Sequence, residues 1–192
     1  MLTVLLGYLA GSVPFAFLLA RRAGIDVRFA GSGNVGAANV LRTAGAGRAT
    51  LVMALDIAKG ALAVALAYLS NAGAVTTAAT GAAAVVGHIY PVWLRFHGGK
   101  GVAVAAGAFA VLTPAATAVA CGLFLVIVRA TRYISLGSIA ATVALPPTAW
   151  LAGAPAAVVA SAAGTAGLIV FRHRANIRRL RAGTERRMGA RA

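Results

Sequence analysis

The sequence predicts an all-α polytopic membrane protein with seven transmembrane helices, and three observations lead to this prediction. First, 60% of the 192 residues are hydrophobic and 11% are charged, whereas soluble domains average about 45–50% apolar and about 25% charged residues. Second, apolar stretches follow one another, most of them near the roughly 20 residues that cross a bilayer. Third, the 18 Lys and Arg residues gather in alternate polar segments. The whole chain, 1–192, is expected to form one integral-membrane domain that ends in a basic cytoplasmic helix or tail, 172–192.

The apolar runs predict spans over 2–20, 50–69, 74–94, 101–112, 114–128, 134–151 and 154–171. The first run has no basic segment before it, which favours a retained span over a cleaved signal peptide. The second contains Asp56 and Lys59, which are three residues apart and are expected to pair. The third ends in Tyr90 and Trp93, which are typical of the aromatic belt at a membrane surface. The fourth is short for a span and is also compatible with a half-helix paired with the fifth.

The positions of the cations predict the orientation. With the N-terminus outside, the inner polar segments are 21–49, 95–100, 129–133 and 172–192, and the outer segments after the N-terminus are 71–73, 113–114 and 152–153. The segments 113–114, 129–133, 152–153 and 172–192 also mark the ends of the last three predicted spans. Every Lys and Arg then lies on the inner side or in the inner part of a helix, as the positive-inside rule requires. We therefore expect an inner-membrane protein with a cytoplasmic C-terminus.

The charged residues exclude several classes of site. The three carboxylates, Asp26, Asp56 and Glu185, are too few for a paired-carboxylate glycosidase or an Asp-rich metal site. The single cysteine, Cys121, excludes a disulfide framework and a Cys-based zinc site. The net charge of +15 is concentrated at the inner face, which favours anionic lipid headgroups over nucleic acid as the partner of the tail. The tail arginines are Arg178, Arg179, Arg181, Arg186, Arg187 and Arg191.

The richest polar loop runs from Gly31 to Arg42. Its glycines match the dinucleotide pattern G-x-G-x-x-G, but no strand precedes them, so we reject that function. A tight turn that opens a short helix near Asn34 would present backbone N–H groups and the Ser32 hydroxyl to an anion. Val35, Asn39 and Arg42 would then share one helical face. The alternative is a polar connector with a capping serine.

A second loop places Gly98, Gly99 and Gly101 around Lys100, so that the backbone can approach a phosphate closely. It is not a Walker A loop, because Gly101 stands where Ser or Thr would hold Mg²⁺. His88 and His97 flank this loop, and without carboxylates they make a poor metal site. They are expected to have structural or interfacial roles.

The third polar segment begins at Arg172. His173, Asn176, Ile177 and Leu180 form one helical face, which we expect to turn toward the protein while the arginines face headgroups and water. Ser135 and Ser138, at the inner end of the sixth span, are predicted to project toward the same volume.

Together these segments resemble the bacterial membrane acyltransferases that pass a fatty acyl group from acyl phosphate to glycerol 3-phosphate. The matching residues are Gly31–Asn34, Asn39, Arg42, Gly87–His88, Gly98–Ala103, Arg172–Arg174 and Asn176–Ile177, with Gly11–Phe15, Leu55–Ile57, Lys59–Gly60 and Gly183–Glu185 in further agreement. The resemblance covers nearly the whole chain. Ala175 is a departure, because the family usually has Glu there, and we expect altered anchoring of the helix and not lost chemistry.

The resemblance implies a seven-helix fold, a cytoplasmic site, and lysophosphatidic acid and inorganic phosphate as products of the first step of phospholipid synthesis. It implies acyl phosphate, glycerol 3-phosphate and membrane lipid as partners, and no metal or organic cofactor. The implied catalytic residues are Ser32, Arg42, Lys100, His173 and Asn176. The implied substrate-binding residues are Gly31, Gly33, Asn34, Asn39, Gly98, Gly99, Gly101 and Ser138.

Acyl phosphate is already activated, so we expect a bound phosphate oxygen to take the proton of the glycerol hydroxyl. General-base catalysis by His173 and a covalent intermediate on Ser32 are the alternatives. Two other classes of protein are the alternatives: a phosphate-ester transporter and a lipid-binding structural protein. The outer halves of the spans are almost entirely apolar, which argues against a transport path. A structural protein would not need the polar residues Ser32, Arg42, Lys100, His173 and Asn176.

Overall fold

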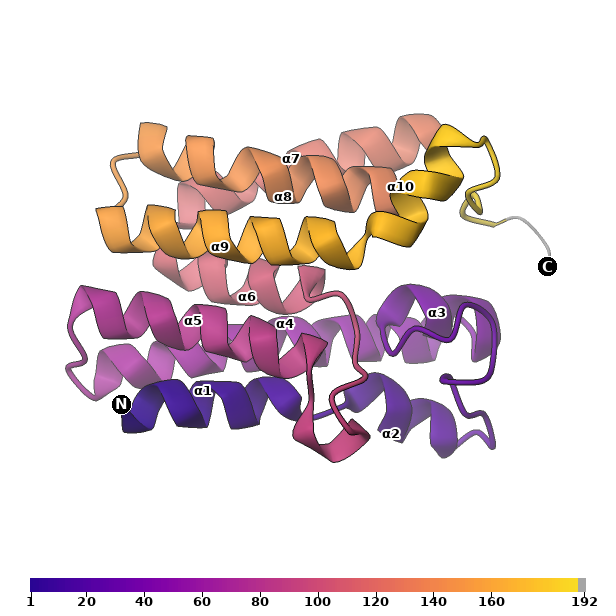
Figure 1. Cartoon of the computed structure of the whole chain (residues 1–192), viewed down its shortest axis with the longest axis horizontal. Coiled ribbons are helices and arrows are strands. Elements are labelled where there is room, and N and C mark those ends of the chain that lie inside the picture. Colours follow the sequence, from indigo (N-terminus) through magenta and orange to yellow (C-terminus); the bar gives the residue numbers. More distant parts are fainter. Residues whose placement is uncertain (190–192) are drawn as a thin grey trace. The chain divides into compact units, whose positions relative to one another are not determined.

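The computed structural model describes residues 1–189, and all regular structure within them is helical, as Figure 1 shows. The chain divides into two compact units, Met1–Leu112 and the part that begins at Thr113. The first unit holds α1 (Leu2–Ser12), α2 (Phe15–Arg21), α3 (Ala37–Thr43), α4 (Ala46–Leu69), α5 (Ala74–Ile89), the short 3-10 helix η1 (Val92–Leu94) and α6 (Val102–Leu112). The second holds α7 (Pro114–Thr131), α8 (Ile134–Leu151), α9 (Ala156–Arg172) and α10 (Arg174–Arg181). The all-α fold is thus confirmed.

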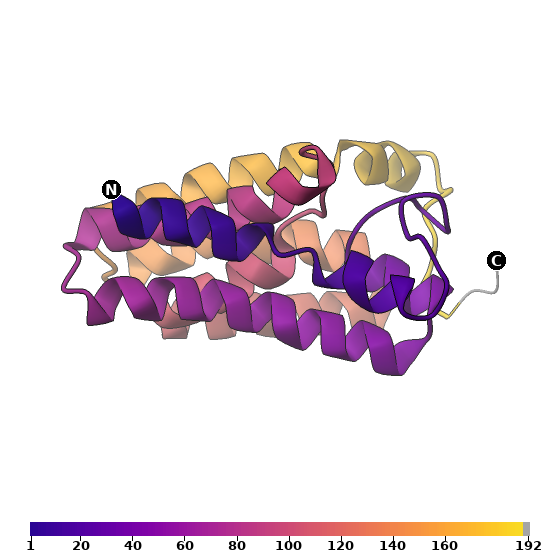
Figure 2. The same ribbon diagram turned by 90° about the horizontal axis from the view of Figure 1, so that it is seen from below.

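In the first unit, α1 packs along α5 and α4, and α4 packs on α6 (Figures 1 and 2). Small residues allow this close approach, as is usual between membrane helices. At Gly11, for example, a Cβ atom would lie against the backbone of Ala84, so α1 could not approach α5 as closely with any other residue there.

The first predicted span, 2–20, is interrupted between α1 and α2. Pro14 has no N–H to donate to the preceding turn, so the helix ends at Ser12 and a new one begins at Phe15. The N–H of Val13 donates to Ala10 at 3.3 Å, and the N–H of Phe15 donates to Val13 at 3.2 Å. The break leaves the Val13 carbonyl outside the regular helical pattern, inside the protein.

The third predicted span, 74–94, is too long at its C-terminal end. The helix α5 ends at Ile89 because Pro91 cannot continue it and restricts the residue before it. The chain then makes the turn of η1, after which Arg95 and Phe96 take positive φ angles of 50° and 64°. This reversal returns the backbone toward the end of α5 and leads into the loop Gly98–Gly101, the glycine loop.

In the second unit, α7 packs on α8, and α8 packs on α9. The last two helices meet at His173 with a bend of 58°. This bend turns the arginine-rich α10 away from the apolar axis of α9. Arg191, the last of the predicted tail arginines, lies outside the described residues.

Within residues 1–189, four helical segments are long and apolar enough to cross a membrane, and the bent α9–α10 pair makes up to five. The four are Leu2–Arg21, Ala46–Leu69, Pro114–Thr131 and Ile134–Leu151. Two other predicted spans fall on shorter helices, α5 with 16 residues and α6 with 11. The chain is therefore a multi-pass helical protein, and the count of seven spans stays a prediction.

Candidate functional site

A buried group of three polar side chains lies inside the first unit. Lys59 Nζ is 2.8 Å from Asp56 Oδ1 on the same helix, α4, which confirms the predicted pair. Both residues are buried, with 6% and 2% of their surfaces exposed. His88 of α5 joins them, with its Nδ1 3.1 Å from Lys59 Nζ and 3.6 Å from Asp56 Oδ1. The sequence analysis gave His88 a structural or interfacial role and did not predict this contact.

Lys59 also reaches the break in the first predicted span. Its Nζ donates to the Val13 carbonyl oxygen at 2.8 Å and lies 5.4 Å from the centre of the Phe15 ring. The Val13 carbonyl also accepts the N–H of Phe15 at 3.2 Å, so Lys59 supplies a second, charged donor at the interruption near Pro14. The charge of Lys59 therefore ties α4 to both sides of the break.

The glycine loop is bound to the end of α5 through its backbone. The N–H of Gly98 donates to the Ile89 carbonyl and the N–H of Gly99 donates to the His88 carbonyl, each at 3.1 Å. A Cβ atom on Gly99 would lie against His88 Nε2 and 2.7 Å from the Val35 carbonyl oxygen. Only glycine therefore allows the loop to approach this closely. The side chain of the next residue, Lys100, is half-buried.

The loop before α3 is organised by Asn39, which is 1% exposed. Its Nδ2 donates to the carbonyls of Val27 and Ala30, each at 3.0 Å, and its Oδ1 accepts the N–H of Ser32 at 2.8 Å. One buried amide thus holds both sides of the glycine turn. The side chain of Ser32 remains exposed at the surface of this turn.

The short helix begins later than predicted. The N–H groups of Asn39 and Val40 both donate to the Gly36 carbonyl, so α3 starts at Ala37 and not near Asn34. Val35 therefore lies before the helix and does not share a helical face with Asn39 and Arg42. The N-cap is Gly36, without a side-chain cap, so Ser32 is not the capping residue of this helix. Of the other predicted residues, Gly31, Gly33 and Arg42 are exposed and Asn34 is half-buried.

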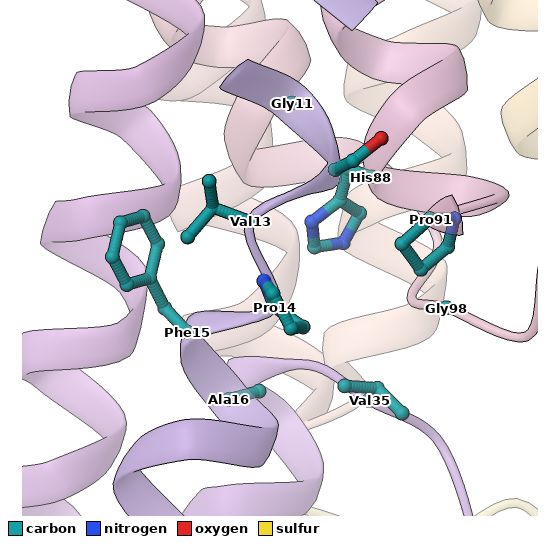
Figure 3. Close-up of a pocket in the computed structure, with 10 residues that line it drawn as sticks. Gly11, Val13, Pro14, Phe15, Ala16, Val35, His88, Pro91 and Gly98 are labelled. Atoms are coloured by element: carbon teal, nitrogen blue, oxygen red, sulfur yellow. The ribbon is translucent and has the colours of Figure 1, made fainter. Parts of the chain in front are cut away.

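A small pocket in the first unit brings four segments together, as Figure 3 shows. Its walls come from the break between α1 and α2, the end of α5, the loop before α3 and the glycine loop. In Figure 3 the imidazole of His88 lies beside the Val13–Pro14 segment, with Val35 and Gly98 at the edge of the same space. Gly98 is the only one of the predicted site residues in this lining.

In the second unit, Glu185 is the centre of a polar cluster. Its Oε1 accepts hydrogen bonds from Ser135 Oγ at 2.8 Å and from Asn176 Nδ2 at 2.6 Å, and its Oε2 lies 2.6 Å from Arg179 Nε. Burial disfavours the charged carboxylate, but the hydrogen bonds from Asn176, Arg179 and Ser135 outweigh it and hold the pKa of Glu185 below its usual range. Glu185 therefore ties the chain after α10 to both α8 and α10.

The other predicted residues of this unit bond to their own helices. His173 is 2% exposed, and its Nδ1 lies 2.8 Å from the Ile169 carbonyl oxygen. A carbonyl only accepts, so Nδ1 of His173 carries a proton in this contact. Ser138 Oγ donates to the Ile134 carbonyl at 2.9 Å. Ser135, not Ser138, shares a partner with Asn176.

Sequence reasoning missed two residues of these clusters. His88 was separated from Asp56 and Lys59 by 29 or more positions, and no pattern indicated that the two helices meet there. Glu185 had a signal, since it is one of the chain's three acidic residues and lies within a strongly basic segment. Ala175, where a Glu was expected, has no carboxylate, and the anchoring acid of this cluster is Glu185.

The Glu185 cluster predicts a loss of stability in acid. Because the pKa of Glu185 is lowered by folding, its carboxylate stabilises the fold above the usual carboxyl pKa, and this contribution is lost as the pH falls through the folded-state value. Hydrogen bonds to a charged group contribute about 1.5–3 kcal/mol, so Glu185→Gln should lower the free energy of unfolding at neutral pH by about 2 kcal/mol. Thermal unfolding in one detergent, from about pH 7 to about pH 3, checks this expectation.

The two curves should converge in acid, because the protonated wild type has also lost its charge. Arg186→Gln is the control, because Arg186 is an exposed residue next to Glu185 and its replacement should leave the dependence of stability on pH unchanged. Equal stability of Glu185→Gln and the wild type at neutral pH would show that the cluster does not stabilise the fold.

The comparisons with known proteins agree with this architecture. Residues 1–183 match the family described as Glycerol-3-phosphate acyltransferase. A Glycerol-3-phosphate acyltransferase of Rubrobacter xylanophilus is 46% identical over 191 residues, which cover 100% of this chain and 96% of that protein. One of Myxococcus xanthus is 47% identical over 186 residues, which cover 96% of this chain and 97% of that protein.

A solved structure gives the same result. The crystal structure of PlsY (YgiH), an integral membrane glycerol 3-phosphate acyltransferase, in its glycerol 3-phosphate form is similar to this chain with a TM-score of 0.94 and 40% identity. The similarity covers 98% of this chain and 94% of that one. The lysophosphatidic acid form matches with a TM-score of 0.92.

The fold and the polar clusters define a multi-pass helical membrane protein with two glycine-rich loops and a basic terminal segment. Within that class, the extent of the sequence match decides the family. The chain belongs to the glycerol-3-phosphate acyltransferase family and is an acyltransferase of phospholipid synthesis. A transporter and a purely structural lipid-binding protein are thereby set aside.

Proposed function

We propose that the protein transfers a fatty acyl group from acyl phosphate to the sn-1 hydroxyl of glycerol 3-phosphate. The products are lysophosphatidic acid and inorganic phosphate. The hydroxyl oxygen attacks the acyl carbon, the bond from that carbon to the phosphate oxygen breaks, and the hydroxyl proton passes to an oxygen of the leaving phosphate. No metal or organic cofactor takes part.

The observation that carries the choice of donor is that every carboxylate of the chain is already bound to a cation. Arg28 Nη2 lies 2.6 Å from Asp26, Lys59 Nζ lies 2.8 Å from Asp56, and Arg179 Nε lies 2.6 Å from Glu185. These are the three acidic residues of the sequence. A carboxylate held by a cation is a weak base. Without a free side-chain carboxylate as base, the reaction is favoured by a donor whose leaving group can itself take the hydroxyl proton, and phosphate is such a group.

The cations and glycine amides of the inner loops suit two phosphorylated substrates. In our proposal the catalytic residues are Ser32, Arg42, Lys100, His173 and Asn176. Gly98, Gly99 and Gly101 shape the side that holds glycerol 3-phosphate, and Gly31, Gly33, Asn34, Asn39 and Ser138 complete the substrate contacts. The hydrogen bond that the Ser32 N–H donates to Asn39 Oδ1 supports this arrangement, because it holds the turn that carries the serine. Positioning and electrostatic stabilisation then supply most of the rate.

We further propose seven spans in one domain over 1–192, with the N-terminus outside and the C-terminus in the cytoplasm. The placement of Lys and Arg along the chain supports this topology. The short helices α5 and α6 count as spans in this proposal. The protein then lies in the bacterial inner membrane, next to its lipid product, with the site open to the cytoplasm.

The proposal is tested by the donor that the purified protein accepts. In detergent or lipid, palmitoyl phosphate and glycerol 3-phosphate should yield inorganic phosphate and lysophosphatidic acid in equal amounts. The reaction should survive EDTA, and palmitoyl-CoA should not replace the acyl phosphate. Phosphate release and the lipid product are measured in the same sample.

Turnover with palmitoyl-CoA and none with palmitoyl phosphate would overturn the choice of donor while leaving the acyltransferase family in place. Loss of activity in EDTA, restored by a divalent metal, would overturn the cofactor-free mechanism.

A further inference from the structure

The cluster of Asp56, Lys59 and His88 is not used by any substrate contact proposed above. Its ion pair is buried within a helix that is long and apolar enough to cross the membrane. Ionisable groups at such positions are costly, and they are usually retained for a function. The question is what this cluster acts on.

The hydrogen bonds that Lys59 donates determine which ring nitrogen of His88 carries a proton. An ammonium group has three N–H donors and no lone pair that could accept a hydrogen bond. Lys59 Nζ has three acceptors close by: Asp56 Oδ1 at 2.8 Å, the Val13 carbonyl at 2.8 Å and His88 Nδ1 at 3.1 Å. The hydrogen bond that Lys59 donates to His88 requires a lone pair on His88 Nδ1. The distance of 3.6 Å from Nδ1 to Asp56 is too long for a competing hydrogen bond.

A ring that accepts at Nδ1 carries its proton on Nε2, and the buried cation holds this ring in place. The Nε2 edge of this ring lies beside Gly99, at a point where a Cβ atom on Gly99 would meet it. The backbone carbonyl of the same histidine accepts the N–H of Gly99 at 3.1 Å, and the next carbonyl accepts the N–H of Gly98. His88 thus contacts the glycine loop through its ring and through its main chain.

The loop before α3 meets the same point. The Val35 carbonyl would lie 2.7 Å from a Cβ atom on Gly99, and Val35 and His88 line the same pocket. A small rotation of the imidazole would therefore move Gly99 relative to both polar loops. A pair that only supported the helices would need neither the histidine nor this contact.

We propose that Asp56, Lys59 and His88 are a positioning cluster, in which the buried ion pair orients His88 and His88 sets the backbone of the Gly98–Lys100 loop for the phosphate of glycerol 3-phosphate. The three residues act through the loop and do not touch the substrate. This inference rests on the proposed function, since it assigns glycerol 3-phosphate to the glycine loop.

Two replacements of His88 separate its two contacts. His88→Asn keeps an acceptor near the position of Nδ1 and removes the donor beside Gly99. His88→Gln keeps a donor near Nε2 and lacks the acceptor that faces Lys59. Thr77→Val is the matched control, because Thr77 is a buried polar residue of α5 whose hydroxyl donates to the Ala72 carbonyl at 3.0 Å, away from the Asp56, Lys59 and His88 cluster.

The affinity for glycerol 3-phosphate is measured by calorimetry without a donor, and KM is measured for each substrate with palmitoyl phosphate as donor. We expect His88→Asn to weaken glycerol 3-phosphate binding and raise its KM about tenfold, and His88→Gln about threefold. The KM for palmitoyl phosphate should stay within about twofold in both variants, and Thr77→Val should change neither KM.

Unchanged affinity and unchanged KM for glycerol 3-phosphate in the folded His88 variants would overturn the proposal, whatever their thermal stability. If His88→Asn does not fold, His88→Gln decides by the same criterion. An equal rise in both KM values would also contradict it, because the effect would not be specific to the glycine loop. Wild type that binds glycerol 3-phosphate but does not react with palmitoyl phosphate would instead contradict the proposed donor, and the binding data would still test the cluster.

Discussion

Lys59→Met should destabilise the protein strongly, lowering the free energy of unfolding by about 3–5 kcal/mol. The replacement removes the cation that lies 2.8 Å from Asp56 and leaves a carboxylate that is 2% exposed without its ion-pair partner. It also removes the donor that reaches the Val13 carbonyl at the break between α1 and α2. The Asp56 carboxylate would then be a buried charge without its cation, and the Val13 carbonyl would keep only the N–H of Phe15 at 3.2 Å.

Thermal or denaturant unfolding in one detergent measures this loss. The double variant Asp56→Asn/Lys59→Met should recover part of the stability, because it contains no uncompensated buried charge. Arg48→Met is the matched control on the same helix, since Arg48 is exposed and its change should fall within about 0.5 kcal/mol of the wild type. If Lys59→Met is as stable as the wild type, the ion pair of Asp56 and Lys59 does not stabilise the fold.

Lys100→Met should lower kcat/KM by about 10²–10³-fold, the range seen when one charge-stabilising donor is removed from an active site. Our proposal places Lys100 among the groups that stabilise the phosphates, and the glycines around it leave no other side chain within that loop to replace its charge. Methionine keeps most of the volume of the side chain, so the fold should be retained. Initial rates of phosphate release from palmitoyl phosphate measure the effect.

Arg129→Met is the control for Lys100→Met, because Arg129 is an exposed cation in the last turn of α7 and has no place in the proposed site. It should leave kcat/KM within about twofold of the wild type. If Lys100→Met retains full turnover, Lys100 is not a catalytic residue. If Lys100→Met and Arg129→Met lose activity equally, the loss results from the lower overall positive charge and not from a specific role of Lys100 in the glycine loop.

Local patterns predicted most of the helices correctly. The apolar runs lie on helices at the predicted places, and the spacing of three between Asp56 and Lys59 predicted their ion pair. These features depend on residues that are near one another in the chain. The first predicted span is found as Leu2–Arg21, although Pro14 breaks its helix. The errors also have local causes: Pro91 ends α5 early, and α3 starts only after Gly36.

The contacts of the polar residues were less predictable. Asn39 could be placed in the first polar loop, but not its three hydrogen bonds to both sides of the glycine turn. Glu185 could be counted as one of few acids, but not as the partner of Ser135, which is 50 positions away. Such contacts form only when two segments that are distant in the sequence pack against each other. The hydrophobic periodicity of a segment does not indicate which other segment it will contact.

The sequence by itself determined that this is a helical membrane protein of the glycerol-3-phosphate acyltransferase family, because composition, hydrophobic run length and local motifs are properties of the chain alone. Only the tertiary structure decided that His88 joins Asp56 and Lys59 beneath the glycine loop, and that Glu185 holds Asn176. The physical reason is that a buried charge must find its partners wherever packing brings them. That choice depends on the arrangement of helices and not on their order in the sequence.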